Sequence, residues 1–215
     1  MPTQLTPTQF FLLMSNLGPR EKLAVALEGW LGPRISEGFG LKWEDLDLDS
    51  RKVTFKQGFT GGRISHLKTE ASRTDLSIPK DVIELLRTWR TLTPYTGPSD
   101  WVFASPYTKG KRPFWPGSFM SNHLQPVARA LGLPHIGWHS FRHSLSAWAK
   151  AAHLPLDDVK TLLRQDTIEM AGQYGKVPFE EKAQLQRTVE RYVRKKVKAQ
   201  SKQVRRRGRT LPTAA

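Results

Sequence analysis

Apolar residues recur at helical spacing over most of the chain, and glycines and prolines separate one run from the next. This pattern predicts helices over Thr8–Leu17, Pro19–Leu31, Ile35–Leu41, Asp81–Thr91, Phe119–Leu131, His139–Ala152, Leu156–Leu163, Ile168–Gln173 and Glu180–Lys198. Shorter apolar runs predict strands over Val53–Phe55, Ile64–Leu67 and Asp75–Pro79, the first two joined by a glycine turn, and a further strand over Trp101–Phe103. The fold class expected is therefore α+β, mainly α, with one small antiparallel sheet.

The composition excludes several kinds of site and indicates where the protein is found. The chain has 215 residues and no Cys, which excludes disulfides, thiolate zinc sites and a cysteine nucleophile. It holds no long apolar run and no signal peptide pattern, which favours a soluble, cytoplasmic protein. His139 and His143 stand four residues apart, as in some zinc sites, but no His-Glu-x-x-His motif contains them, and no metal or other cofactor is expected.

The charge balance indicates the kind of partner. Lys and Arg number 34 against 19 Asp and Glu, which gives a net charge of +15. Residues 194–209 hold nine of the basic residues and no acid; the remaining 25 basic residues still exceed the 19 acidic ones by 6. A body that stays basic without its tail favours a nucleic acid partner, although a soluble basic protein with a charged end would share this balance. The tail after Ala199 has few apolar residues and is expected to be mobile.

Five side chains suit chemistry at a phosphate. The guanidiniums of Arg34 and Arg142 hold phosphate oxygens in a planar, bidentate fork and neutralise charge in the transition state. Lys68, in the predicted hairpin region, can protonate a leaving alkoxide. The Tyr174 hydroxyl is a candidate nucleophile that needs activation, and His139, near a predicted helix N-terminus, is a candidate base.

Four segments, in order, resemble the motif boxes of the tyrosine recombinase (phage integrase) family. Gly32–Asp47 resembles its first arginine box, and Lys68–Pro79 its hairpin lysine with the following strand. Trp138–Ser144 is similar to its His-x-x-Arg box, and Leu162–Tyr174 to the segment with its nucleophile. The order and spacing fit over residues 8–198, so the resemblance implies an integrase-like catalytic domain.

The resemblance also implies a mechanism. Tyr174 attacks a scissile DNA phosphate and forms a 3′-phosphotyrosine link, while Lys68 protonates the released 5′-hydroxyl. Arg34 and Arg142 clamp the phosphate, and His139 assists proton transfer at the tyrosine. A second 5′-hydroxyl can then reverse the step on another strand, as in integration or excision of a mobile element.

Two positions depart from the family pattern of Leu-Gly-His before the nucleophile. Gln165 stands where the family has His or Trp, and its neutral amide can still donate to the phosphate. Arg164 replaces the glycine, either as a further phosphate contact or as a helix C-cap. Glu37, one turn after Arg34, is expected to be a structural acceptor. Two alternatives stay open: a DNA-relaxing enzyme like type IB topoisomerases, and a DNA-binding relic with impaired chemistry.

The resemblance divides the chain into a catalytic domain, residues 1–199, and a basic tail, residues 200–215. The family carries a clamp domain ahead of the catalytic one. The short stretch before Arg34 predicts either a truncated protein or a natural form with the catalytic domain alone. The expected partner is double-stranded DNA, with a tetramer formed on DNA through the C-terminal helix. Association with the nucleoid follows from this expectation.

Overall fold

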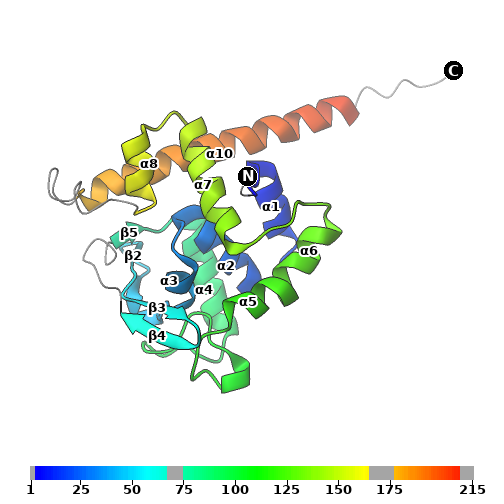
Figure 1. Ribbon diagram of the computed structural model, residues 1–215. Coiled ribbons are helices and arrows are strands. Elements are labelled where there is room, and N and C mark those ends of the chain that lie inside the picture. Colours follow the sequence, from blue (N-terminus) through cyan, green and yellow to red (C-terminus); the bar gives the residue numbers. More distant parts are fainter. Residues whose placement is uncertain (1–2, 67–74, 165–176, 209–215) are drawn as a thin grey trace.

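The computed structural model describes residues 3–66, 75–164 and 177–208, with side chains described as far as residue 202. Helices dominate this part of the chain (Figure 1). They are α1 (Pro7–Ser15), α2 (Pro19–Leu31), α3 (Ile35–Phe39), α4 (Lys80–Leu92), α5 (Pro116–Phe119), α6 (Gln125–Ala130), α7 (Trp138–Ala151), α8 (Leu156–Leu162) and α10 (Phe179–Gly208). The fold class predicted from the sequence is confirmed. The predicted helix 168–173 lies outside the described residues.

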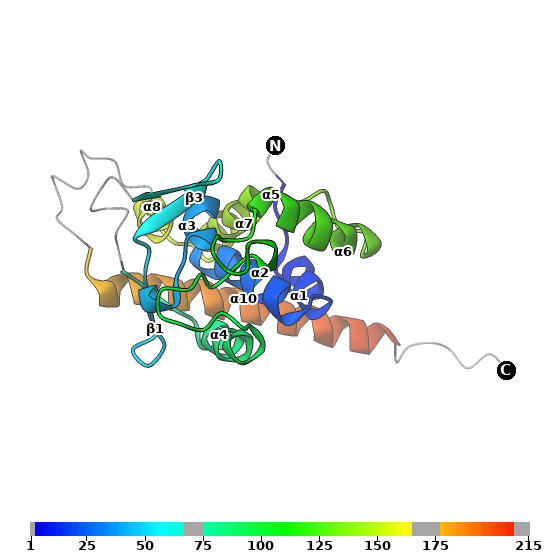
Figure 2. The same cartoon turned by 90° about the horizontal axis from the view of Figure 1, so that it is seen from below.

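Helix α2 forms the centre of the molecule, with α1, α4, α7 and α10 around it (Figure 2). Its sequence suits this position, because the residues from Leu23 to Leu31 are apolar except for Glu28 and Gly29. All of them are buried. Pro19 starts the helix, and Gly32 ends it with a left-handed φ of 54° that a glycine adopts without steric cost. The ring of Phe10 packs closely on this helix, since a Cβ added at Gly29 would lie 2.3 Å from it.

The strands form two small antiparallel sheets, not the single one expected. They are β1 (Leu46–Asp47), β2 (Lys52–Thr54), β3 (Gln57–Thr60), β4 (Arg63–His66) and β5 (Asp75–Ser77). One sheet has the order β1-β2-β5, and the other is the β3–β4 hairpin. The predicted pairing of Val53–Phe55 with Ile64–Leu67 is wrong: Val53 pairs with Leu46 and Leu76, and Ile64 pairs with Phe59. The cause is the turn between β3 and β4, whose two residues, both glycines with positive φ, close a tight local hairpin.

Two further predictions differ from the structure. Residues 101–103 make no strand, and only Trp101 forms a bridge, with Lys42. The segment that follows Lys42 enters a 3-10 helix at Trp43, and this ends the ladder. The helix predicted over 119–131 is divided into α5, a π-helical turn (Met120–Leu124) and α6. Pro126 has no N–H to donate to the preceding turn, which accounts for the break in regular α-helix.

Helix α10 crosses the domain behind α7 and α8 and continues beyond α1 (Figures 1 and 2). Its buried residues Ala183, Val189 and Val193 pack on its own domain, where the helix contacts α1, α7, α8 and β5. It continues to Gly208, past the predicted end at Lys198, while the basic tail expected from residue 200 stays a prediction. Lys, Arg and Gln, which fill this stretch, are good helix formers even without an apolar face. The domain boundary at residue 199 stays a prediction.

Candidate active site

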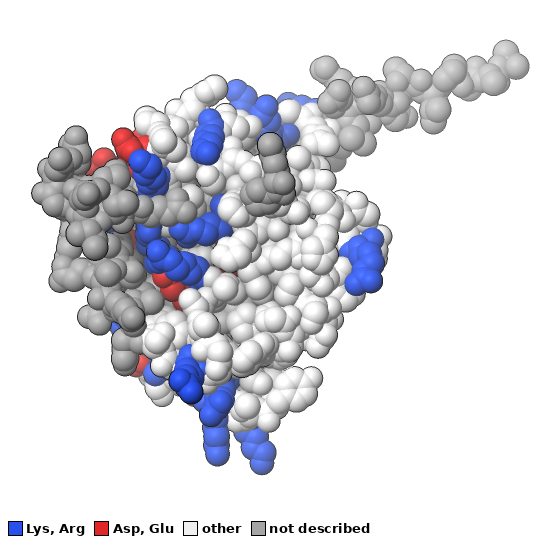
Figure 3. All heavy atoms as spheres, in the orientation of Figure 1, with Lys and Arg blue, Asp and Glu red and all other residues white. Residues whose placement is uncertain are grey.

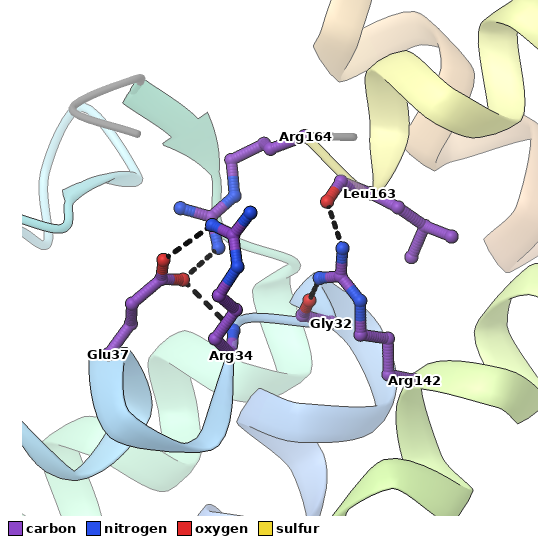
Figure 4. A network of polar contacts seen from close by, with 6 residues as sticks. All are labelled: Gly32, Arg34, Glu37, Arg142, Leu163 and Arg164. Carbon is purple, nitrogen blue, oxygen red and sulfur yellow. Dashed lines mark hydrogen bonds and ion pairs between the residues drawn. The ribbon is translucent and has the colours of Figure 1, made fainter. Parts of the chain in front are cut away.

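Arg34 stands at the junction of α2 and α3, where its backbone and its side chain both bond the same carboxylate. As the N-cap of α3, it donates its backbone N–H to Glu37 Oε2 at 2.9 Å, and its Nη1 lies 3.0 Å from Glu37 Oε1. The Glu37 side chain is fully buried, whereas that of Arg34 is 52% exposed. Glu37 therefore fixes the orientation of a guanidinium that faces solvent, which confirms its expected part as a structural acceptor (Figure 4).

Arg164 reaches the same carboxylate from the end of α8. Its Nη2 lies 2.5 Å from Glu37 Oε2, its side chain is 3% exposed, and its guanidinium carbon lies 4.7 Å from the centre of the Phe55 ring. Its backbone has a φ of 53°, the left-handed conformation in which helices commonly end on glycine. Of the two interpretations from the sequence, the helix end is thus confirmed; the phosphate contact stays a prediction, and the side chain is paired with Glu37.

Charge, not burial, decides the ionisation of Glu37. Burial acts to raise the pKa of this carboxyl, but the positive charge of Arg164 and the hydrogen bonds from Arg34 and Arg164 outweigh it. The pKa of Glu37 is therefore lower than usual, and the group is a carboxylate at neutral pH. A buried carboxylate between two guanidiniums is a rigid support for the exposed one.

Arg142, on α7, connects three segments that lie far apart in the sequence. Its Nη1 donates to the carbonyl of Gly32, 110 residues away, and its Nη2 donates to the carbonyl of Leu163 at 2.5 Å. Burial, together with the positive charges of Arg164 and Arg34, lowers the pKa of Arg142 to about 10. That value is well above neutral, so Arg142 stays charged beside Arg34 and makes the site strongly positive.

Arg34, Arg142 and Arg164 form an arginine cluster, and Glu28, a residue that the motifs did not single out, lies beneath it. Its side chain belongs to the buried interior of α2, and a Cβ added at Gly38 would lie 2.3 Å from its Oε1. Burial raises the pKa of Glu28 well above its usual value, and the charge of Glu37 raises it further, against the opposing effects of Arg142 and Arg164. The sequence does contain a signal, because Glu28 is an acid inside an apolar helical run.

His139 lies in the first turn of α7, three residues before Arg142 and so on the same side of the helix. Its side chain is exposed. The neighbouring Trp138 fixes the start of α7, because its Nε1 donates to the carbonyl of Pro116 at 2.8 Å and its ring packs against Phe39. The structure thus places His139 and Arg142 together on one element.

Lys68, Gln165 and Tyr174 lie outside the described residues. Gln165 follows Arg164 directly in the chain, and Lys68 falls between β4 and β5. Within residues 3–66, 75–164 and 177–208, no group of three or more His, Asp or Glu side chains is placed to hold a metal ion. In the same ranges, no helix is both long enough and apolar enough to cross a membrane.

Comparison with known proteins decides the family. The family profile described as "Phage integrase family" matches residues 4–181, which is most of the chain. The chain belongs to the phage integrase family. The resemblance carried by the four motif segments is confirmed by this match. A search of curated protein sequences found no match.

Solved integrase and recombinase structures share this fold. The Tn1549 transposon integrase, in complex with a circular intermediate DNA, has a TM-score of 0.66 at 17% identity over 87% of this chain and 66% of that one. The integrase from mycobacterium phage Brujita has a TM-score of 0.62 at 19% identity, covering 88% of this chain and 58% of the other. XerA recombinase gives 0.60 at 15% identity, with 84% and 61% covered. The chain thus spans about two thirds or less of these relatives.

Basic side chains gather on the face of the molecule that Figure 3 shows. Lys and Arg lie left of its middle and at its lower edge, and few Asp and Glu side chains are visible among them. An excess of cationic side chains on one face attracts anionic groups. The part of each residue in catalysis stays a prediction.

Proposed function

We propose that this chain is a site-specific DNA recombinase that cleaves and rejoins strands through a 3′-phosphotyrosine intermediate on Tyr174. The observation that supports this most is the hydrogen bond from Arg142 to the Gly32 carbonyl, which brings α7 to the start of the Arg34 segment. Two guanidiniums thereby belong to one site, and one of them is half exposed and held by a buried carboxylate. Such a pair is suited to hold a phosphodiester and the charge of its transition state.

In the proposed first step, the Tyr174 hydroxyl oxygen attacks the scissile phosphorus as its proton leaves. The bond from phosphorus to the 5′-oxygen breaks, and Lys68 gives that oxygen a proton, so that a free 5′-hydroxyl results. A 5′-hydroxyl from another strand then attacks the phosphotyrosine and releases Tyr174. The phosphoester is conserved throughout, so the reaction uses no cofactor.

Arg34 and Arg142 neutralise the phosphate during both steps. Each guanidinium has five N–H donors, and the contacts shown involve only Nη1 of Arg34 and the two Nη atoms of Arg142. Both side chains therefore keep N–H donors for phosphate oxygens. His139 assists proton transfer at the tyrosine, and Gln165 donates from its amide without any change of charge.

Covalent trapping tests the proposal. The protein and its Tyr174→Phe variant are incubated with nicked and with randomised duplexes, denatured, and examined on a gel for a protein–DNA adduct. The proposal predicts an adduct with the first protein and none with the variant, and sequencing of the trapped DNA then identifies the site. An adduct that survives in Tyr174→Phe would contradict the assignment of the nucleophile.

Two other outcomes identify the alternatives. Relaxation of a supercoiled plasmid that carries no trapped site would indicate a topoisomerase-like enzyme. Stable DNA binding with no adduct would indicate a relic, and the substitution Gln165→His then separates its causes. If the Gln165→His variant forms an adduct, the defect lies at Gln165. If this variant forms none either, the defect lies elsewhere.

The proposal includes assembly to a tetramer on DNA and association with the nucleoid. The apolar residues of α10 are buried in their own domain, so we expect a contact with a second copy to use the exposed part of α10 beyond Val193. Truncation after Lys195 keeps the buried residues and removes the rest. Sedimentation of the protein–DNA complex is expected to show a smaller assembly, and an unchanged one would exclude this part of α10 from the contact.

A further inference from the structure

An open pocket of about 450 Å³ lies between the β3–β4 hairpin and residues 105–122. Its lining is rich in aromatic side chains, from Phe59, Tyr107, Phe114 and Trp115. Tyr107 is 86% exposed and Trp115 is 49% exposed, which is unusual for side chains of this size. None of these residues belongs to the motif segments that place the arginine cluster.

The rings are held in place from below. Trp115 packs edge to face on Phe59, with ring centres 5.7 Å apart, and Tyr107 packs similarly on Phe114 at 6.0 Å. Gly62 lies beside the indole, since a Cβ there would meet the Trp115 ring at an ordinary contact distance of 3.4 Å. The structure therefore presents two large exposed rings, each supported by a buried one, beside an open volume.

The charge around the pocket favours an anionic occupant. Residues 50–69 and 101–156 contain no Asp or Glu, and every lining residue of the pocket comes from these two segments. Arg112 lines the pocket and contacts the Gly62 carbonyl at 3.5 Å, while Lys109 and Lys111 precede it in the chain. Polar groups of Ser105, Ser118 and Asn122 complete the lining.

Exposed aromatic rings with basic neighbours are the combination by which proteins bind single-stranded nucleic acid, since each base has a face for stacking and each nucleotide a phosphate. A paired base has its faces covered by its neighbours, so the rings select an unpaired one. The strand β3, which lines the pocket through Phe59, also packs on the helix that Arg34 starts: a Cβ at Gly58 in β3 would lie 3.3 Å from Ser36. One strand can therefore pass from the arginine cluster along the β3–α3 layer to the pocket.

We propose that this pocket holds an unpaired base of the DNA strand that the arginine cluster binds. The base stacks on Trp115 and Tyr107, and Arg112 pairs with a phosphate of the same strand. This inference rests on the proposed action on DNA. It adds to that proposal a subsite for unpaired DNA, such as strands released by cleavage contain.

Fluorescence polarisation with the full chain tests the inference. The probes are a labelled thymidine oligonucleotide of about ten nucleotides and a duplex of equal length. Tyr107→Ala and Trp115→Ala are each expected to weaken single-strand binding by about 5- to 150-fold, the cost of one lost stacking contact, with duplex affinity unchanged within about two-fold. Leu92→Ala removes another exposed apolar side chain, 57% exposed at the end of α4, and is the matched control, with no effect on either probe.

Trp115 provides a direct signal, because it is the most exposed tryptophan among the described residues. Binding of the single strand is expected to quench tryptophan fluorescence. Trp115→Phe should keep most of the affinity, because a ring remains, and lose most of the quenching.

Three results would overturn the inference: single-strand affinity that persists in both alanine variants, equal losses on single strand and duplex, or loss of concentration-dependent self-association in those variants, which would assign the pocket to a second copy. Failure of the proposed function looks different. In that case the unsubstituted protein forms no Tyr174 adduct, whatever its single-strand affinity.

Discussion

At the scale of single residues, the unusual feature is Glu37, a buried carboxylate shared by Arg34 and Arg164. The motif predicted that Glu37 would be an acceptor for Arg34. It could not predict Arg164, which lies 127 residues further along the chain and stands at a position where glycine is common. An ion pair between distant segments leaves no local pattern in a sequence, so it becomes visible only in three dimensions.

Two substitutions of Arg164 separate its side chain from its backbone. Arg164→Ala removes the inner partner of Glu37 and is expected to lower the free energy of unfolding by about 3 kcal/mol, because a buried charge loses its counterion. Arg164→Gly loses the same ion pair but adopts the left-handed φ without strain, so it should be more stable than the alanine variant by about 1 kcal/mol. Urea unfolding measures both. An alanine variant as stable as the glycine variant would refute the strain argument.

Glu28 gives a prediction about pH. Its pKa is raised in the folded state, so the native protein holds this proton more tightly than the unfolded chain does. The contribution of Glu28 to the free energy of unfolding is fully present at low pH. It is lost by about 1.4 kcal/mol per pH unit as the pH rises from 4.5, the usual pKa of a glutamate, toward the raised pKa of the folded state. Glu28→Gln removes the effect, so its stability advantage should grow above pH 4.5 and vanish below it.

Urea unfolding at a series of pH values checks this dependence. The substitution of an exposed acid on α4, Glu84→Gln, is the control and should show no such growing advantage. A stability difference between Glu28→Gln and the original protein that is the same at every pH would contradict the raised pKa.

At the scale of elements, hydrophobic periodicity predicted the helices well and the strand pairing badly. The run Pro19–Leu31 matches α2 at both ends, because a proline and a glycine mark its limits. The strands of two to four residues are too short for a period of two to specify their partners. A turn of two glycines settled the pairing of β3 with β4 instead, and that local hairpin left β2 to pair with β1 and β5.

Packing of α1 on α2 reverses the usual effect of glycine in a helix. An alanine normally stabilises a helix interior by about 1 kcal/mol relative to glycine. At Gly29 the added Cβ would lie 2.3 Å from the Phe10 ring, which is itself held between Trp30 and Trp148. Gly29→Ala is therefore expected to lower the midpoint of thermal unfolding, at a cost of about 1–3 kcal/mol for overpacking.

The matched control for this packing effect is Gly117→Ala in α5. A Cβ at that position meets Trp115 at an ordinary contact distance of 3.4 Å, so the change should be neutral or stabilising. Calorimetry of both variants provides the comparison. A stabilised Gly29→Ala protein would mean that Phe10 moves aside easily, contrary to its place in the core.

At the scale of the whole molecule, charge is distributed so that one face and one helix carry most of the excess. The pocket and Arg142 lie in segments without Asp or Glu, whereas α10 carries a second set of basic residues on an element that crosses the back of the domain. Composition alone predicted a basic body and a basic tail. It could not show that α10 connects the basic body to the basic tail. Good helix formers continue this helix past its last buried apolar residue, and composition does not reveal that continuity.

The salt dependence of duplex binding separates these two contributions. Binding that neutralises phosphates releases counterions, so the logarithm of the affinity falls with that of the salt concentration by about 0.9 per phosphate contact. Truncation after Lys202 removes the four arginines at positions 205, 206, 207 and 209 and should lower this slope by at most about 4. Because Arg34 and Arg142 remain in the truncated protein, a substantial slope should remain, and Arg34→Ala together with Arg142→Ala should reduce it further. Duplex binding that becomes insensitive to salt on truncation alone would place the whole electrostatic contact in the tail and leave the arginine cluster without a phosphate.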